Sequence, residues 1–136
     1  MTEKTLTLAL MNPPYESANS TTAFRIISAA LKRGLRVNVF AYEGAVYLPF
    51  ARQAQHANAV HGRTVEEENH PLPRAWIASL MTAAASHGQK LDWVNCGLCV
   101  DERGAAEAID GVRRGSPADL WNFAQKADNT LVIATR

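Results

Sequence analysis

Residues 5–42, TLTLALMNPPYESANSTTAFRIISAALKRGLRVNVFAY, decide the fold class of this 136-residue chain. The apolar run at 5–11 has the length of a buried strand, and the two prolines behind it end that strand. Apolar residues then recur at helical spacing after Ser20, which we expect to be the N-cap residue, and Gly34 follows the helix. A second apolar strand is expected at 35–42. A strand, a helix and a second strand in this order favour a parallel sheet with a right-handed crossover.

The remainder of the chain continues this alternation. Ser116-Pro117 is a strong helix start, because serine is a preferred N-cap and proline suits the first helical position. The order of elements predicts an α/β protein: one doubly wound, mostly parallel sheet with helices on both faces, in a single domain of residues 1–136. The expected elements are a short helix at 46–51, a helix at 74–87, a strand at 91–95, a helical turn at 105–109, a turn at 111–115, a helix from Ser116 and a strand at 130–135.

Residues 55–72 differ in character from the chain on either side. They are polar, include Glu66-Glu67-Glu68 and end at two prolines. We interpret this segment as a surface excursion, either a lid over a pocket or a plain insertion.

Composition and charge exclude several classes of function. The 14 lysines and arginines nearly balance 13 aspartates and glutamates, and a net charge of +1 gives no bulk attraction to nucleic acid. No apolar run has the roughly 18–20 residues of a membrane span, and no export signal is visible, so we expect a cytoplasmic protein. Neither of the common glycine-rich phosphate loops occurs, so we expect no nucleotide and no other cofactor.

The two cysteines, Cys96 and Cys99, are the most informative residues. They occupy an expected loop, 96–104, at the exit of the third strand. A thiol at such an exit meets backbone N–H groups that favour its thiolate, and Arg103 could supply a cation while Gly97 and Gly104 allow close backbone approach. Such a thiolate on Cys96 could take sulfur as a persulfide, which Cys99 could receive or resolve.

Two other loops end strands at the same edge of the expected sheet, where α/β folds place their sites. They are 12–19 and 43–45, and they contribute Asn12, Tyr15 and Gly44 to the candidate pocket. Tyr15 either directs its hydroxyl into this pocket or anchors its loop by packing, as loop aromatics more often do.

Composition alone leaves other roles open for the cysteines. They could be inert core residues, because free cysteine packs as a small hydrophobe. Zinc would need further ligands, which His56, His61 and His70 could provide, although no second close pair of ligands is present, and we expect no metal. A thioredoxin-type redox pair also has two cysteines in a C-x-x-C spacing.

The segment Cys96-Gly-Leu-Cys99-x-x-x-Arg103-Gly104, after a Leu-Asp-x-Val strand, resembles the cysteine loop of the DsrE/DsrF-like family. The family comprises small α/β proteins of sulfur relay and sulfur oxidation and includes the TusD-type subunits of tRNA thiolation. Weaker similarities lie in three further stretches, so that the resemblance covers nearly the whole chain: Asn12-Pro-Pro-Tyr15, the strand exit at 40–46 and the C-terminal third from Ile109.

The resemblance implies a sulfur carrier or sulfurtransferase-like protein with Cys96 as its sulfur-accepting cysteine. Cys99 matches a second cysteine that only some members have. Members often form homotrimers, homohexamers or mixed hexamers and exchange sulfur with donor and acceptor proteins. A non-catalytic assembly module with packed cysteines, and a Cys96/Cys99 redox switch, remain the alternatives.

Overall fold

The computed structural model describes residues 3–135 and contains a five-stranded parallel sheet. The strand order is β4-β3-β2-β1-β5, and all four neighbouring pairs run parallel. This confirms the predicted α/β class with a parallel sheet. The strands are β1 (Thr5–Leu10), β2 (Arg36–Ala41), β3 (Leu91–Cys96), β4 (Val112–Gly115) and β5 (Asn129–Ile133).

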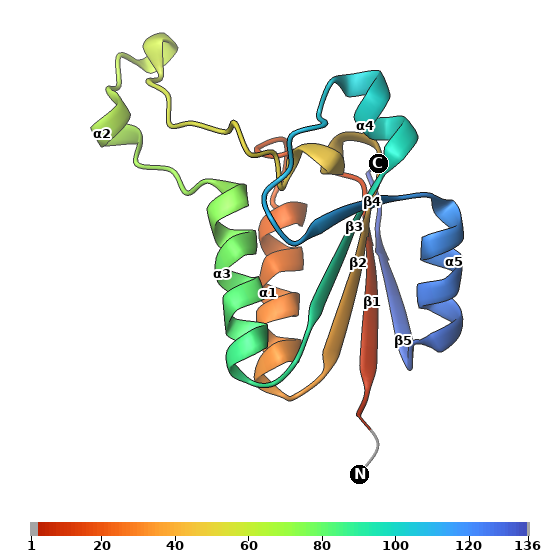
Figure 1. Ribbon diagram of the computed structural model, residues 1–136. Coiled ribbons are helices and arrows are strands. Elements are labelled where there is room, and N and C mark those ends of the chain that lie inside the picture. The colour runs from red at the N-terminus through yellow and green to blue at the C-terminus, as the bar shows by residue number, and fades with distance from the viewer. Residues whose placement is uncertain (1–2, 136) are drawn as a thin grey trace.

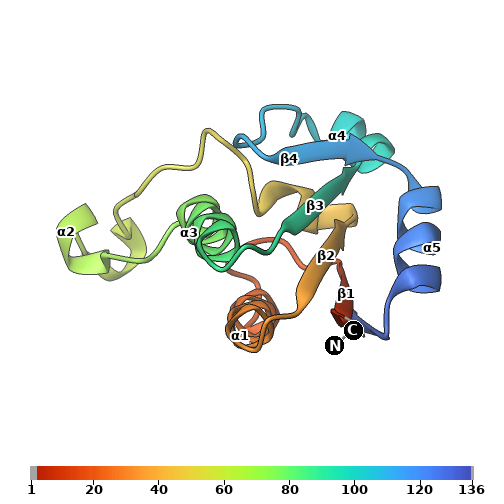
Figure 2. The same ribbon diagram turned by 60° about the horizontal axis from the view of Figure 1, so that its bottom comes forward.

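Helices lie on both faces of the sheet, as predicted. The two longest, α1 (Asn19–Lys32) and α3 (Pro73–Ser86), cover one face, and α5 (Pro117–Lys126) lies against the other (Figures 1 and 2). The short α4 (Gly97–Arg103) stands at the carboxyl edge, above the ends of the strands. A 3-10 helix η1 (Glu43–Tyr47) follows β2 at this edge.

The alternation of strand side chains makes the two faces unequal. Val37 and Val39 of β2 are fully buried in the main core, which contains side chains of α1 and α3. Phe40 points to the opposite face and joins a smaller cluster with Val94 and Cys96. The carboxyl end of β3 therefore delivers Cys96 to the face that α5 covers.

Two expected elements at the C-terminal side of Cys96 are wrong. Residues 96–104 are not a loop, because α4 begins directly after Cys96 and ends at Gly104. Residues 111–115 are not a turn, because Val112–Gly115 form β4 and pair with Trp93–Cys96. Both depend on contacts with distant residues, which local sequence does not encode.

The positions of the other expected helices differ less from the observed ones. The helix expected at 46–51 is the earlier η1, and no helix occupies 105–109. Ser20 is not the N-cap residue, because α1 begins at Asn19 and Ala18 takes the N-cap position. The preceding loop turns tightly through Tyr15, whose φ of 69° lies in the left-handed region, and this brings the helix start forward.

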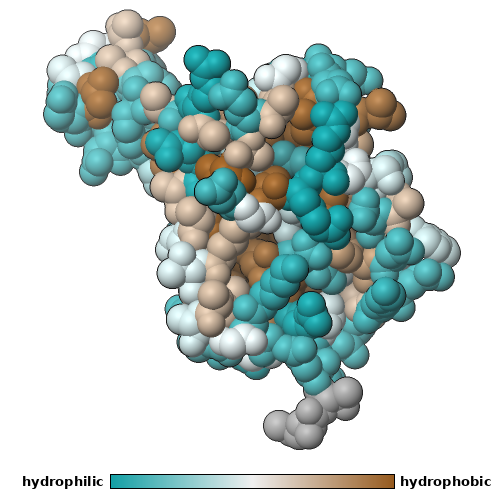
Figure 3. Space-filling view, viewed as in Figure 1, coloured by the Kyte–Doolittle hydropathy of each residue, from teal (hydrophilic) through white to brown (hydrophobic). Residues whose placement is uncertain are grey.

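Residues 52–72, called here the excursion, extend away from the sheet (Figure 1). They contain η2 (Ala59–His61) and α2 (Val65–Glu68), and their surface is mostly hydrophilic with isolated apolar side chains (Figure 3). One attachment to the body is a hydrogen bond of 2.9 Å that the Tyr15 hydroxyl donates to the carbonyl of Pro71. The interpretation of residues 55–72 as a lid or a plain insertion stays a prediction.

Candidate functional site

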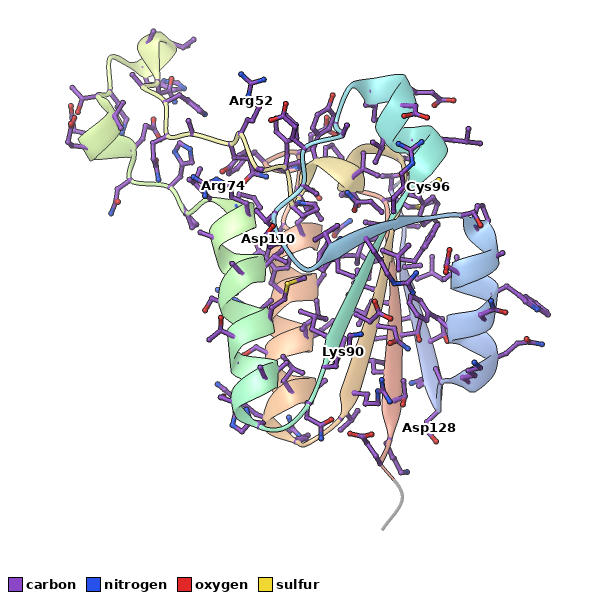
Figure 4. The ribbon with its side chains drawn as sticks, in the orientation of Figure 1. Arg52, Arg74, Lys90, Cys96, Asp110 and Asp128 are labelled. Carbon is purple, nitrogen blue, oxygen red and sulfur yellow. The ribbon has the colours of Figure 1, made fainter. Side chains whose placement is uncertain are left out.

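The two cysteines lie side by side at the carboxyl edge of the sheet. Cys96 is the last residue of β3 and the N-cap residue of α4 (Figure 4). Cys99 lies in the first turn of that helix. Both thiols are free. Cys96 is 6% exposed, whereas Cys99 is partly exposed.

The surroundings of Cys99 act on its charge in opposite directions. Burial raises the pKa of the Cys99 thiol, and so does the neighbouring Cys96 side chain, whose cluster it packs against. The backbone N–H of Glu43 and the Arg103 guanidinium lower that pKa. The net direction is upward, so Cys99 is held toward its neutral thiol form.

The contact of Glu43 with Cys99 joins the loop after β2 to the cysteine segment. Glu43 has a φ of 51°, in the left-handed region that residues other than glycine rarely adopt. The Glu43 backbone N–H lowers the pKa of the nearby Cys99 thiol. Strained backbone that persists at such a place is held by its surroundings and is common at functional sites.

A guanidinium lies against Gly97, the residue after Cys96, and belongs to Arg114 of β4. A Cβ added to Gly97 would lie 2.7 Å from Arg114 Nε, so this side chain crosses directly over the residue after Cys96. Asp101 of α4 holds it with two hydrogen bonds, one of 2.9 Å between Nη1 and Oδ1. These bonds raise the pKa of Arg114, and the charge of Cys96 adds to that effect. The same pairing lowers the pKa of Asp101.

Arg103, the cation expected from the sequence, has other partners. Its Nη1 lies 3.5 Å from Oε2 of Glu102, and its carbonyl accepts a hydrogen bond from the Tyr47 hydroxyl. Its electrostatic effect is on Cys99. The structure therefore places Arg114, rather than Arg103, against the backbone of the Cys96 turn. Sequence reasoning missed Arg114 because β4 was not predicted.

The predicted glycines serve the backbone in different ways. Gly104 ends α4 in the left-handed conformation, with a φ of 63°. Gly97 leaves room for Arg114. Gly44 faces the ring of Pro13, where an added Cβ would lie 2.8 Å from Cδ. Gly44 thus allows the loops after β1 and β2 to pack together.

The remaining predicted residues face other partners. Asn12 is almost completely buried and accepts a hydrogen bond of 3.2 Å from Nδ2 of Asn19. Tyr15 directs its hydroxyl to Pro71 in the excursion, so it anchors its loop instead of pointing at a thiol.

The histidines considered for zinc do not join the cysteines. The rings of His56 and His70 lie 4.7 Å apart in the excursion. Within residues 3–135, no group of three histidine, cysteine, aspartate or glutamate side chains is placed to hold a metal ion. In the same range, no helix has the length and apolarity to cross a membrane.

Comparison with known proteins adds a decisive match. The family model of the DsrE/DsrF-like family matches residues 4–133. The chain belongs to the DsrE/DsrF-like family. The cysteine segment, both flanking strands and α5 all lie inside the matched region of this DsrE/DsrF-like chain, so the resemblance inferred from Cys96 to Gly104 is confirmed.

Two individual proteins are similar to it. Protein MJ0989 of Methanocaldococcus jannaschii is 25% identical over 129 residues, which cover 93% of this chain and 97% of that protein. The crystal structure of the ychN protein from E. coli has a TM-score of 0.65 at 20% identity and covers 96% of this chain and 99% of the other. This second similarity confirms the fold.

Proposed function

We propose that this DsrE/DsrF-like protein is a sulfur carrier and that Cys96 accepts sulfane sulfur as a persulfide. The observation that carries the proposal is the arrangement at the end of β3, where Cys96 contacts a second thiol and a clamped guanidinium crosses the adjoining peptide. A cation beside a thiol stabilises the thiolate, which is the nucleophilic form. Family membership supports a role in sulfur relay.

The loading step is a thiol exchange. The Cys96 thiolate attacks the outer sulfur of a donor persulfide R–S–SH, forming a new S–S bond as the bond inside the donor breaks. The donor leaves as R–S⁻ and takes up a proton, and Cys96 then carries the transferred sulfur. The step needs no added oxidant or reductant, because one S–S bond replaces another. Arg114 would stabilise the negative sulfur before and after the exchange.

Delivery reverses this exchange. An acceptor thiolate attacks the outer sulfur of the Cys96 persulfide, and Cys96 departs as the thiolate. The acceptor is a cysteine of a partner protein or Cys99, whose thiol contacts Cys96. Because its pKa is raised, Cys99 must first lose its proton to act as the acceptor.

Partner proteins would reach Cys96 from the carboxyl edge. Leu98 of α4, between the two cysteines, is 71% exposed and offers an apolar contact. Trp121 of α5 is also largely exposed and would suit a contact between subunits of a homotrimer or homohexamer.

Mass spectrometry of the intact protein after incubation with polysulfide tests the proposal. The wild type and Cys99→Ser should gain the mass of sulfur atoms that dithiothreitol removes, and Cys96→Ser should not. Cys99→Ser is the matched control, since it removes the neighbouring thiol and leaves Cys96 in place. Equal loading of Cys96→Ser and wild type would refute the role of Cys96.

The contact between the thiols also favours a second candidate, a reversible Cys96–Cys99 disulfide. Titration in buffers with varied ratios of reduced to oxidised glutathione measures the reduction potential of this pair. Formation of the disulfide removes two hydrogens from the two thiols. A disulfide that forms in these buffers, together with no retained persulfide, would favour the switch. If Cys96 and Cys99 react neither with polysulfide nor in the glutathione buffers, the remaining alternative is a non-catalytic assembly module with packed cysteines.

A further inference from the structure

A second concave site lies between the loop after β1 and the base of the excursion, and neither cysteine lines it. It is a cavity of about 200 Å³ between the loop after β1, the start of α1 and the start of α3. An engineered apolar cavity of about 150 Å³ is enough for benzene, so this one has room for a small organic molecule. Its walls are mainly aromatic and proline rings: Pro14, Tyr15, Phe24, Pro71, Pro73 and Trp76.

One end of the cavity is the N-terminus of α1, and it is polar. Ser17, Ser20 and Thr21 line this end. The helix has 14 residues, its N-cap residue Ala18 offers no side-chain acceptor, and its first turn contains no acidic residue. Asn19 donates its backbone N–H to Ser17 Oγ at 3.2 Å. Such a helix end carries positive potential that an anion can satisfy.

One buried polar atom of the cavity wall has no hydrogen-bond partner within the described residues. Ser20 is 8% exposed and lines the cavity, yet its Oγ makes no hydrogen bond. Nε2 of His70 is also buried without a partner, and its ring lies edge-on to Tyr15 with centroids 5.3 Å apart. Among residues 3–135 the third such atom is Oε1 of Gln89. Buried polar atoms are nearly always hydrogen-bonded, so the unpaired Ser20 Oγ in the cavity wall indicates a missing ligand.

We propose that this cavity binds a small organic carboxylate. The carboxylate would accept hydrogen bonds from Ser20 Oγ and from the backbone N–H groups of Ser20 and Thr21. The apolar body of the ligand would lie against the rings of Phe24 and Trp76. Inorganic anions fit less well, because most of the wall is apolar. The site adjoins the end of β1, and carboxyl ends of strands are where doubly wound folds bind ligands.

The excursion completes this site. Pro71 contributes to the wall, and its carbonyl is held by the Tyr15 hydroxyl at 2.9 Å. The hydrogen bond fixes Tyr15, another wall residue, against the excursion. The inference is independent of the sulfur-carrier proposal, since it uses neither cysteine.

Titration of the full chain with phenylacetate, followed by ¹H–¹⁵N NMR, tests the proposal. We expect saturable shifts at the backbone amides of Ser20 and Thr21 and at the indole N–H of Trp76. Phenylethylamine, which has the same apolar body and the opposite charge, should shift these signals far less. Ser20→Ala should weaken phenylacetate binding about tenfold, as expected for one charge-assisted hydrogen bond.

Thr22→Ala is the matched control, because Thr22 is exposed and lies next to the cavity residues on the same helix. It should bind phenylacetate as the wild type does. The proposal is overturned if phenylacetate leaves the three signals unmoved, if the amine binds as tightly, or if Ser20→Ala binds like the wild type. The comparison of acid and amine uses unaltered protein, so it decides the matter even if a variant misfolds. Polysulfide loading of Ser20→Ala should match the wild type, which separates this test from that of Cys96.

Discussion

The connections that follow β1 and β3 leave the same edge of one parallel sheet but present different chemistry. After β3 the helix α4 begins at once, and the charged groups there are paired, Arg114 with Asp101. After β1 the chain turns through Tyr15 before the longer α1, and the buried Ser20 Oγ is left without a partner. One connection thus holds the proposed nucleophile next to a paired arginine, and the other forms the proposed carboxylate site. Equivalent places in the fold do not imply equivalent functions.

The largest expected effect concerns the residue that lets the strand ends pack together. Gly44 follows β2, which lies between β1 and β3, and a Cβ there would meet the rigid ring of Pro13. Gly44→Ala should lower the free energy of unfolding by about 1–3 kcal/mol, the usual cost of overpacking. Urea denaturation monitored by circular dichroism measures it.

Gly104→Ala is the comparison for that experiment. Gly104 has a φ of 63° but open space around its α-carbon, so only the left-handed backbone disfavours alanine, at about 1 kcal/mol. A loss in Gly44→Ala no greater than in Gly104→Ala would show that the loops after β1 and β2 do not depend on their close contact.

The next prediction concerns the counter-charge after β3. In a Cys99→Ser background, Arg114→Gln should slow alkylation of Cys96 by iodoacetamide at pH 7 about tenfold, because the thiolate loses an adjacent cation. Arg113→Gln is the matched control, since Arg113 pairs with Asp92 and Asp119 instead. Equal rates of Cys96 alkylation in the two arginine variants would show that Arg114 does not activate the Cys96 thiol. Neither change should affect phenylacetate binding near α1.

Much of the fold could be predicted because its signals are local. The strands at 5–10 and 36–41 are short segments rich in apolar residues, and α1 and α5 show apolar residues at helical spacing. By contrast, β4 contains one apolar residue in Val112–Gly115 and is an edge strand paired only with β3. Its extended backbone comes from that pairing, so no periodicity indicated it.

The candidate site divides in the same way. The position of Cys96 followed from an apolar strand that ended at a cysteine, and the structure confirms that position. The position of Arg114 could not be predicted from the sequence, because the pairing of β3 with β4 is what places its side chain against Gly97. The contact of Tyr15 with Pro71 joins residues 56 positions apart across the excursion, and sequence spacing carries no information about it.

A smaller loss of stability is expected when the carboxylate of Asp119, in the first turn of α5, is removed. Asp119 accepts hydrogen bonds from the Ser116 backbone N–H and from Arg113, and these lower the pKa of Asp119. A lowered pKa in the folded state means that Asp119 stabilises the fold above the ordinary aspartate pKa of about 4. That contribution is lost as the pH falls through the lowered value.

Asp119→Ala should therefore cost about 0.5–1 kcal/mol at pH 7, the size of a lost helix cap, and progressively less in acid. Guanidinium denaturation at pH 7 and pH 2 gives the two values. Asp110→Ala, at an exposed residue that forms no ion pair within residues 3–135, should change stability little at either pH. A cost of Asp119→Ala that stays constant with pH would contradict the role assigned to its charge.

The smallest expected effect returns to the connection after β1 and has the opposite sign. Ser20→Ala removes a buried hydroxyl that has no hydrogen bond in the free protein, so it should raise the free energy of unfolding by about 0.5 kcal/mol. Alanine is also the better helix former, and Thr22→Ala on the exposed surface of α1 measures that contribution separately. A gain in Ser20→Ala beyond that of Thr22→Ala identifies the unpaired hydroxyl as a cost to the folded state. A loss relative to Thr22→Ala would mean that Ser20 Oγ is already bonded within the chain. A serine that weakens the free protein but strengthens carboxylate binding has the trade-off between stability and activity expected of a binding residue.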